Sequence, residues 1–304
     1  MPETNTSLDP AHALAEHVVE TTIEDVPEET ITATRLDVLD TFGAILGGSG
    51  APGIRELTAV TERWGGLEEA RLAVIGGKMP AHHAALINSA MGHALDFDDM
   101  SYAGQVHGSV IILPAVLAAA ERNGVDGQRL LEAFLGGSET AYILGSALSY
   151  SHYLKGWWAT ATLGGIGAAL GSGMALGLNL SQLTAAISLS AIQANGMVAV
   201  LGYDAKPIIA GQAARLGVES AILASQGNTA PEMSASATCR TCNQQILKFD
   251  KMLTNQLRTN QCGNTLTLQL FAVGKINPVS LCVTRRSGNI QQPTMSRIHN
   301  FRGT

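Results

Sequence analysis

Aromatic residues are scarce in this chain, although hydrophobic residues are not. Phe, Trp and Tyr together make up 5% of the 304 residues, whereas there are 33 glycines. A chain that is poor in aromatics and rich in glycine is more typical of closely packed helices than of β architecture. Because 46% of the residues are hydrophobic, the chain has enough apolar material for a large core, which excludes a disordered protein.

An excess of positive charge is also missing. The formal net charge of −6 offers nothing to a phosphate backbone, so we do not expect nucleic acid as a partner. The first twenty residues lack the basic and apolar segments of a secretory signal, and Glu3, Asp9 and Glu16 argue against a transit peptide. We therefore expect a cytoplasmic location, with an organelle such as the mitochondrion left open.

Charged side chains are absent from residues 156–203. The portion 159–178 is long enough to cross a bilayer, but Gly, Ala, Thr and Ser dominate it, and no aromatic belt or basic flank is present. We therefore predict a pair of helices buried on all sides and no membrane association. Leu170 follows Gly165 and Gly167 where a dinucleotide-binding fingerprint needs a third glycine, so no such cofactor is predicted.

The composition changes at Gly227. Before it there are 23 acidic and 10 basic residues, and after it there are 2 and 9. All four cysteines, Cys239, Cys242, Cys262 and Cys282, lie in the second part, where a zinc site is an alternative to unpaired thiols. We predict a helical domain over residues 1–232 and an atypical, basic, poorly ordered tail over 233–304, with no metal assigned.

Hydrophobic periodicity and the placement of proline and glycine predict a mainly α fold. One short strand is expected, over residues 71–74. The predicted helices cover residues 10–21, 28–46, 81–98, 114–123, 128–148 and 179–195.

Candidate chemistry gathers in residues 91–114, MGHALDFDDMSYAGQVHGSVIILP. An apolar helix would deliver Asp96, Asp98 and Asp99 to its C-terminal end, where the helix dipole disfavours anions, and His107 follows. A further cation, Lys206, stands beside the charge-free block, in a turn that we expect Pro207 to fix. The alternatives are a solvated acidic loop, a packed histidine and a solvated lysine.

Five ordered blocks of this sequence resemble the MmgE/PrpD family, which includes 2-methylcitrate dehydratases, cis-aconitate decarboxylases and iminodisuccinate epimerases. The resemblance covers about residues 9–232. It rests on RLDVLDTFGAILGGS at 35–49, the run 88–99 that ends in HALDFDD, HGSVIILPA at 107–115, GWWATATLG at 156–164 and DAKPIIAGQAA at 204–214.

The family resemblance implies a large helical domain with a smaller α/β lid, usually as a homodimer, and a site without metal or other cofactor. The lid is missing from this chain's pattern. By the same resemblance Asp96, His107 and Lys206 match site residues of relatives. Imidazole titrates near neutral pH, so we assign His107 as the proton-transfer group. Lys206 would stabilise negative charge, and Asp96 would orient the imidazole or hold a substrate hydroxyl.

Asp99, Ser109 and Thr160 complete the prediction as substrate-binding residues. Thr160 has an alternative role as a helix cap. The expected function is that of a lyase acting on a small polycarboxylic acid, either cis-aconitate decarboxylase-like or 2-methylcitrate dehydratase-like. An epimerase of an amino or imino dicarboxylate and a truncated, inactive paralogue are the alternatives.

Three positions depart from the family pattern. Met100 stands where a threonine is usual, Trp158 replaces a histidine, and Ile209 replaces another. An indole N–H donates a hydrogen bond but does not titrate usefully, so chemistry that depends on a histidine at 158 is in doubt.

Overall fold

A computed structural model describes residues 9–231, 266–270 and 279–283 of the chain. Within these residues the fold is mainly helical, which confirms the predicted class. The α-helices are α1 (Pro10–Glu20), α2 (Glu28–Gly48), α3 (Ile54–Trp64), α4 (Ala81–His93), α5 (Ser109–Asn123), α6 (Gly127–Leu154), α7 (Ala159–Ala175), α8 (Leu180–Gln193) and α9 (Ala205–Ser225). Two 3₁₀ turns lie between helices: Ile23–Asp25 between α1 and α2, and Val198–Val200 between α8 and α9.

Helix α7 is the centre of the bundle. Each of its residues is buried, and it packs against α5, α6, α8 and α9. Its glycines allow this closeness: a Cβ at Gly167 would lie 2.4 Å from the Gly137 carbonyl oxygen on α6. The predicted burial on all sides is therefore confirmed for α7. It is wrong for α8, which buries one face and exposes Ile192.

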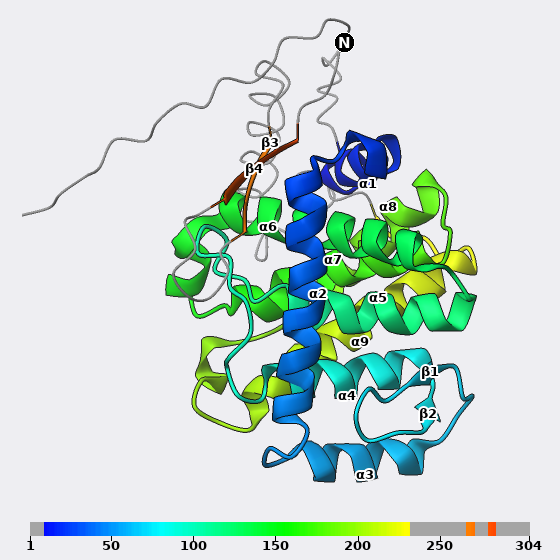
Figure 1. Ribbon diagram of the computed structural model, residues 1–304, viewed down its shortest axis with the longest axis vertical. Helices are drawn as coiled ribbons and strands as arrows, with labels where there is room; N and C mark the ends of the chain where they lie inside the picture. The colour runs from blue at the N-terminus through cyan, green and yellow to red at the C-terminus, as the bar shows by residue number, and fades with distance from the viewer. Residues whose placement is uncertain (1–8, 232–265, 271–278, 284–304) are drawn as a thin grey trace, which may run out of the picture.

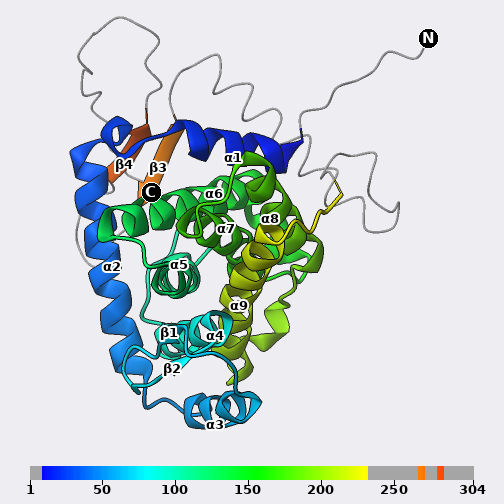
Figure 2. The same ribbon diagram turned by 90° about the vertical axis from the view of Figure 1, so that its right-hand side faces the viewer.

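Helix α2 lies along one edge of the bundle (Figure 2). In Figure 1 it runs lengthwise across the helices behind it, and it packs mainly on α4. Its inner face supplies Thr34, Thr41 and Ile45 to the interior, whereas Leu36, Leu39 and Leu46 are exposed. The exposed apolar side chains leave this helix with an outer face that no described segment covers.

Two small antiparallel pairs are the only strands among the described residues. β1 (Ala70–Arg71) pairs with β2 (Lys78–Met79), close to the strand predicted over 71–74. β3 (Leu266–Leu270) pairs with β4 (Val279–Val283), with Leu268 opposite Leu281. This second pair was not predicted, and the remaining residues of the 233–304 tail, including Cys239, Cys242 and Cys262, lie outside the described residues.

Several predicted boundaries are wrong. α5 begins at Ser109 rather than at residue 114, so Pro114 lies inside the helix and leaves the Val110 carbonyl without its usual i+4 donor. α6 continues to Leu154, and α3 was not predicted. α4 ends at His93, because the chain turns there and Asp96 adopts a positive φ of 54°.

Lys206 lies in the first turn of α9 rather than in a separate turn. Pro207 suits this place, since a residue in the first turn needs no intrahelical partner for its N–H. Among the described residues, no helix combines the length and the apolar character that crossing a membrane requires.

Candidate active site

The loop between α4 and α5 folds back on itself and carries most of the candidate site. Ser101 and Val106 form an isolated antiparallel bridge, with N–H to O distances of 2.9 and 3.3 Å. The bridge closes the loop, so that residues before it and after it meet. Asp98 and His107, nine positions apart in the sequence, are thereby brought into contact.

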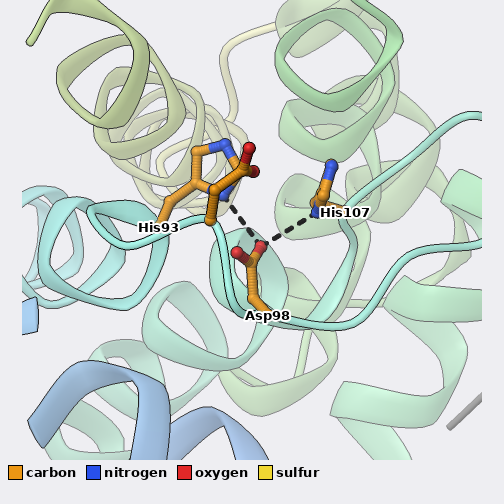
Figure 3. Close-up of side chains that lie close together, drawn as sticks. His93, Asp98 and His107 are labelled. Atoms are coloured by element: carbon orange, nitrogen blue, oxygen red, sulfur yellow. Dashed lines mark hydrogen bonds and ion pairs between the residues drawn. The ribbon is translucent and has the colours of Figure 1, made fainter. Parts of the chain in front are cut away.

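One carboxylate oxygen lies between two imidazoles (Figure 3). His93 Nδ1 is 2.8 Å from Asp98 Oδ2, in a buried hydrogen bond. His107 Nδ1 is 3.2 Å from the same oxygen, in an ion-pair contact whose angle is less well directed. The two rings meet edge to face with centroids 4.9 Å apart. Asp98 is therefore the carboxylate that orients His107, rather than Asp96.

Burial and charge act in opposite directions on this group. Burial raises the pKa of Asp98, but the contacts from His107 and His93 more than offset it and hold that pKa well below its usual range. Burial lowers the pKa of His107, whereas Asp98 and Asp99 raise it, and the net shift is upward. With Nδ1 facing Asp98, the other nitrogen of His107 is left for proton transfer.

Lys206 brings a cation to the same place from a distant part of the chain. Its Nζ is 2.5 Å from Asp96 Oδ1 and 5.9 Å from the centre of the Trp158 ring. Burial raises the pKa of Asp96, but the ion pair with Lys206 more than offsets this effect and holds that pKa below its ordinary value. A ring nitrogen of His107 and a carboxylate oxygen of Asp96 lie within 4.8 Å of one another, so the three predicted catalytic side chains converge.

Trp158 closes the group from α7, where it is the N-cap residue. The indole is 4% exposed and stacks on the His93 ring, with centroids 5.4 Å apart. The side chain thus lies next to both His93 and Lys206. It contributes packing and a cation–π contact in place of a titrating group.

The three predicted substrate-binding residues are enclosed by the protein. Asp99 accepts hydrogen bonds from the Ser109 N–H at 3.2 Å and from the Tyr142 hydroxyl at 3.0 Å, so both of its oxygens are used. Ser109 is 1% exposed. Thr160 is fully buried, and its Oγ1 accepts the backbone N–H of His107 at 3.1 Å. This geometry favours supporting roles for all three, because they hold the loop and His107 in place.

His93, Asp96, Asp98 and His107 place ligand atoms within 4.8 Å of one another, a spacing that a divalent cation could use. We do not assign a cation here, because the ammonium of Lys206 already pairs with Asp96 and would repel it. A small cavity lined by residues of α1, α6 and α7, among them Val18, Glu132 and Met174, shares no residue with this group.

His93 was not among the predicted site residues. It lies in the HALDFDD block, but a histidine in an apolar helical run is usually a packed core residue. Its position five residues before Asp98 was the available signal. Only the turn after His93 directs its Nδ1 back to that carboxylate.

Asp98 and Asp99 are expected to affect stability with opposite pH dependence. The lowered pKa of Asp98 means that its stabilising effect is present above about pH 4 and is lost as the pH falls towards the folded-state pKa. Asp98→Asn should lower the free energy of unfolding at pH 7 by about 3 kcal/mol, because buried imidazole contacts are weakened. Urea unfolding at pH 7 and pH 3 should show this difference shrinking in acid.

Asp99→Asn is the matched control. Burial, with Asp98 next to it, raises the pKa of Asp99 to about 6, so ionising Asp99 costs stability as the pH rises from about 4 to beyond 6. The amide should therefore gain stability relative to the native protein over that interval. Parallel pH profiles for the two variants would contradict the assignment of the charge to Asp98.

Comparison with known proteins decides the family. The MmgE/PrpD N-terminal domain matches residues 12–245, which is more than half of the chain. The chain belongs to the MmgE/PrpD family. All the residues of the candidate site lie within the matched region.

The chain is also similar in sequence to cis-aconitate decarboxylases and to a cis-aconitate decarboxylase-like protein. The cis-aconitate decarboxylase of Aspergillus terreus is 28% identical over 211 residues, covering 67% of this chain and 43% of that protein. The cis-aconitate decarboxylase-like protein oryM of Aspergillus oryzae is 29% identical over 226 residues, covering 70% and 46%. The human cis-aconitate decarboxylase is 30% identical over 158 residues, covering 49% and 32%. The chain spans less than half the length of these relatives.

Proposed function

We propose that this chain is a lyase-type acid/base domain that acts on a small polycarboxylic acid, in the manner of a cis-aconitate decarboxylase or a 2-methylcitrate dehydratase. The observation that carries the proposal is the convergence of a carboxylate-bound imidazole, His107, with the ammonium of Lys206. Proton transfer next to a carboxylate needs a base and a fixed cation in this relation. The similarity to cis-aconitate decarboxylases supports the decarboxylating form.

His107 would transfer the proton. In a dehydration, its free ring nitrogen takes the hydrogen next to the substrate carboxylate and the C–H electron pair passes into an enediolate. That pair then forms the C=C bond as the C–O bond breaks, and the imidazolium returns its proton to the leaving hydroxyl group, which departs as water. In a decarboxylation, the C–C electron pair stays on carbon as carbon dioxide leaves, and a proton is delivered to that carbon. Both routes need the same imidazole in opposite protonation states.

Lys206 would bind the substrate carboxylate on which negative charge develops. Its side chain is 13% exposed, so a ligand would meet a cation that is largely withdrawn from water. Charge stabilisation is stronger in such a place than in bulk solvent. Asp96, which is 59% exposed, would move aside or bind a substrate hydroxyl. No metal or other cofactor is part of the proposed reaction.

The decisive experiment offers cis-aconitate, 2-methylcitrate and an iminodicarboxylate to the purified chain in deuterated buffer that contains EDTA. Carbon dioxide release identifies a decarboxylase, water loss identifies a dehydratase, and deuterium incorporation without either identifies an epimerase. No turnover and no exchange with any acid would overturn the proposal. That result would favour the inactive paralogue.

We also propose that two copies of the chain associate through the outer face of α2. Leu36, Leu39 and Leu46 are each more than half exposed, and a Cβ at Gly43 would meet nothing within 4 Å. The spacing of residues 36, 39, 43 and 46 is the same in both directions. An antiparallel copy therefore sets Leu39 opposite Gly43 and Leu36 opposite Leu46, which suits a two-fold interface.

Leu39→Asp is expected to weaken this dimer by at least about tenfold, because a charge would be buried at the interface. Sedimentation equilibrium would measure the change. Leu67→Asp is the matched control, since Leu67 is 73% exposed and lies outside α2. A native chain that is monomeric at all concentrations, or an equal effect of both variants, would contradict the interface.

A further inference from the structure

His93 has no role in the reaction as described, yet its side chain is completely buried within the site. It lies in the last turn of α4, and its side chain is 0% exposed. Nδ1 contacts Asp98, while Nε2 has no hydrogen-bond partner among the described residues. A buried imidazole with one unsatisfied nitrogen costs free energy, and an apolar residue would fill the same space without that cost. The imidazole therefore calls for a function.

The surroundings hold His93 in a single orientation. Its ring stacks on Trp158 and meets the edge of the His107 ring. The preceding residue, Gly92, packs so closely that a Cβ there would lie 3.0 Å from Val110 Cγ1 on α5. The backbone and the ring are thus both fixed, and Nδ1 is aimed at one oxygen of Asp98.

We propose that His93 is a positioning residue for His107, acting through the Asp98 oxygen that the two imidazoles share. The Nδ1–H of His93 occupies one electron pair of Oδ2 and fixes the carboxylate, which leaves the same oxygen facing His107 Nδ1 at 3.2 Å. His107 is then held with its second nitrogen available to a substrate. The effect of His93 on kcat rests on the proposed function, whereas its effect on the titration of His107 does not.

Sharing the oxygen also moderates the basicity of His107. A carboxylate that already accepts one hydrogen bond attracts a second proton less strongly than a free one. Without the His93 donor, the Asp98 carboxylate would interact with His107 alone, which would stabilise the imidazolium form of His107. Asp96, Asp99 and Lys206 also face His107, and all three would stay in place in a variant at position 93.

Two substitutions separate the donor from the bulk of the ring. His93→Asn keeps an N–H close to the position of Nδ1, whereas His93→Phe keeps the stacking on Trp158 and removes the donor. In the full chain with isotope-labelled histidine, nuclear magnetic resonance would follow the titration of His107. The Phe variant should raise the proton affinity of His107 by about three- to tenfold, and the Asn variant should stay close to the native value.

An unchanged or lowered proton affinity of His107 in folded His93→Phe would overturn the inference. If the Phe variant does not fold, His93→Gln removes the donor at the Nδ1 position while it keeps a polar side chain, and the same shift is expected. This readout needs no turnover. Failure of the native chain to convert any acid would count against the proposed function, and the titration would still decide the role of His93.

Kinetics give a second readout once a substrate is known. Because the Phe variant keeps His107 protonated to higher pH, its kcat for a base-dependent step should fall more at pH 6 than at pH 8, with little change in KM. A purely structural role would lower kcat by the same factor at both pH values. Restoration of the native profile by His93→Asn would show that the N–H is what matters.

Discussion

Replacement of His107 by alanine is expected to lower kcat by about 10²–10⁴-fold, the usual range for loss of a general acid or base. The imidazole is the titrating group that Asp98 holds next to the Lys206 cation, and its side chain is still 16% exposed to a ligand. Steady-state assays with the best acid would measure the loss. KM should change less than kcat, because in the proposed reaction the imidazole would act on the reacting hydrogen rather than on a substrate carboxylate.

The pH profile makes this prediction specific. Burial lowers the pKa of His107, but the contact with Asp98 raises it by more, so that this pKa lies above the ordinary value of about 6.5. If the neutral imidazole is the base, kcat/KM of the native chain rises as the pH passes through that raised pKa. His107→Ala should lose the rise, and added imidazole should restore part of the turnover.

His12→Ala is the matched control for a lost histidine. His12 lies on α1, which the structure places at the far end of the bundle from α4 (Figure 2). This variant should keep native turnover and the native pH profile. Native kinetics in His107→Ala would instead remove His107 from the reaction and leave the site without its proposed base.

The absence of charged residues predicted the buried helix α7 correctly and α8 only in part. The charge-free stretch before Tyr203 indicated full burial, and α7 confirms it because glycine and alanine allow backbones to approach. α8 shows the limit of that argument: residues 180–193 also lack charge, yet Ser181, Ile192 and Gln193 are exposed on one side of the helix, while Ser188 and Ser190 are buried. An absence of charge permits burial but does not require it.

The ends of helices were less accessible to prediction. A proline is compatible with a turn, with the first turn of a helix and, at the loss of one hydrogen bond, with a helix interior. Pro207 was predicted in a turn but lies in the first turn of α9, and Pro114 was predicted at a helix start but lies inside α5. Asp96, just after the end of α4, adopts a left-handed backbone conformation that is uncommon outside glycine, although Asp and Asn adopt it more often than other residues. Tertiary contacts, above all the pairing of Asp96 with Lys206, compensate for such conformations.

The candidate site was predicted in part: its predicted catalytic residues lie together, but His93 and Asp98, which contact one another at its centre, were not among the predicted site residues. Family resemblance supplied Asp96, His107 and Lys206, and the structure brings them together although Lys206 lies 110 positions after Asp96. The resemblance did not indicate that Asp98 would contact His107 while Asp96 pairs with Lys206. Neighbouring acidic residues look alike in a sequence, and only the turn of the loop decides which of them points inward.

Replacement of Lys206 by methionine is expected to lower kcat/KM for a polycarboxylate by about 10²–10³-fold. The effect of losing one fixed group that stabilises developing charge is of this size. Methionine keeps a chain of similar length against Trp158, so packing should change little. Steady-state kinetics would measure the loss, and circular dichroism would check that the fold is retained.

Asp96 complicates this variant in a way that can be tested. Without the lysine its carboxylate would remain unpaired at the site and would repel an anionic substrate by itself. The double variant Lys206→Met with Asp96→Asn removes both charges. The reference is Asp96→Asn alone, because Asp96 is itself proposed to meet the substrate. If Lys206 acts only by neutralising Asp96, the double variant has the same kcat/KM as Asp96→Asn. If Lys206 binds the substrate carboxylate, as we propose, the double variant stays at least about tenfold below Asp96→Asn, because no cation then faces the developing charge.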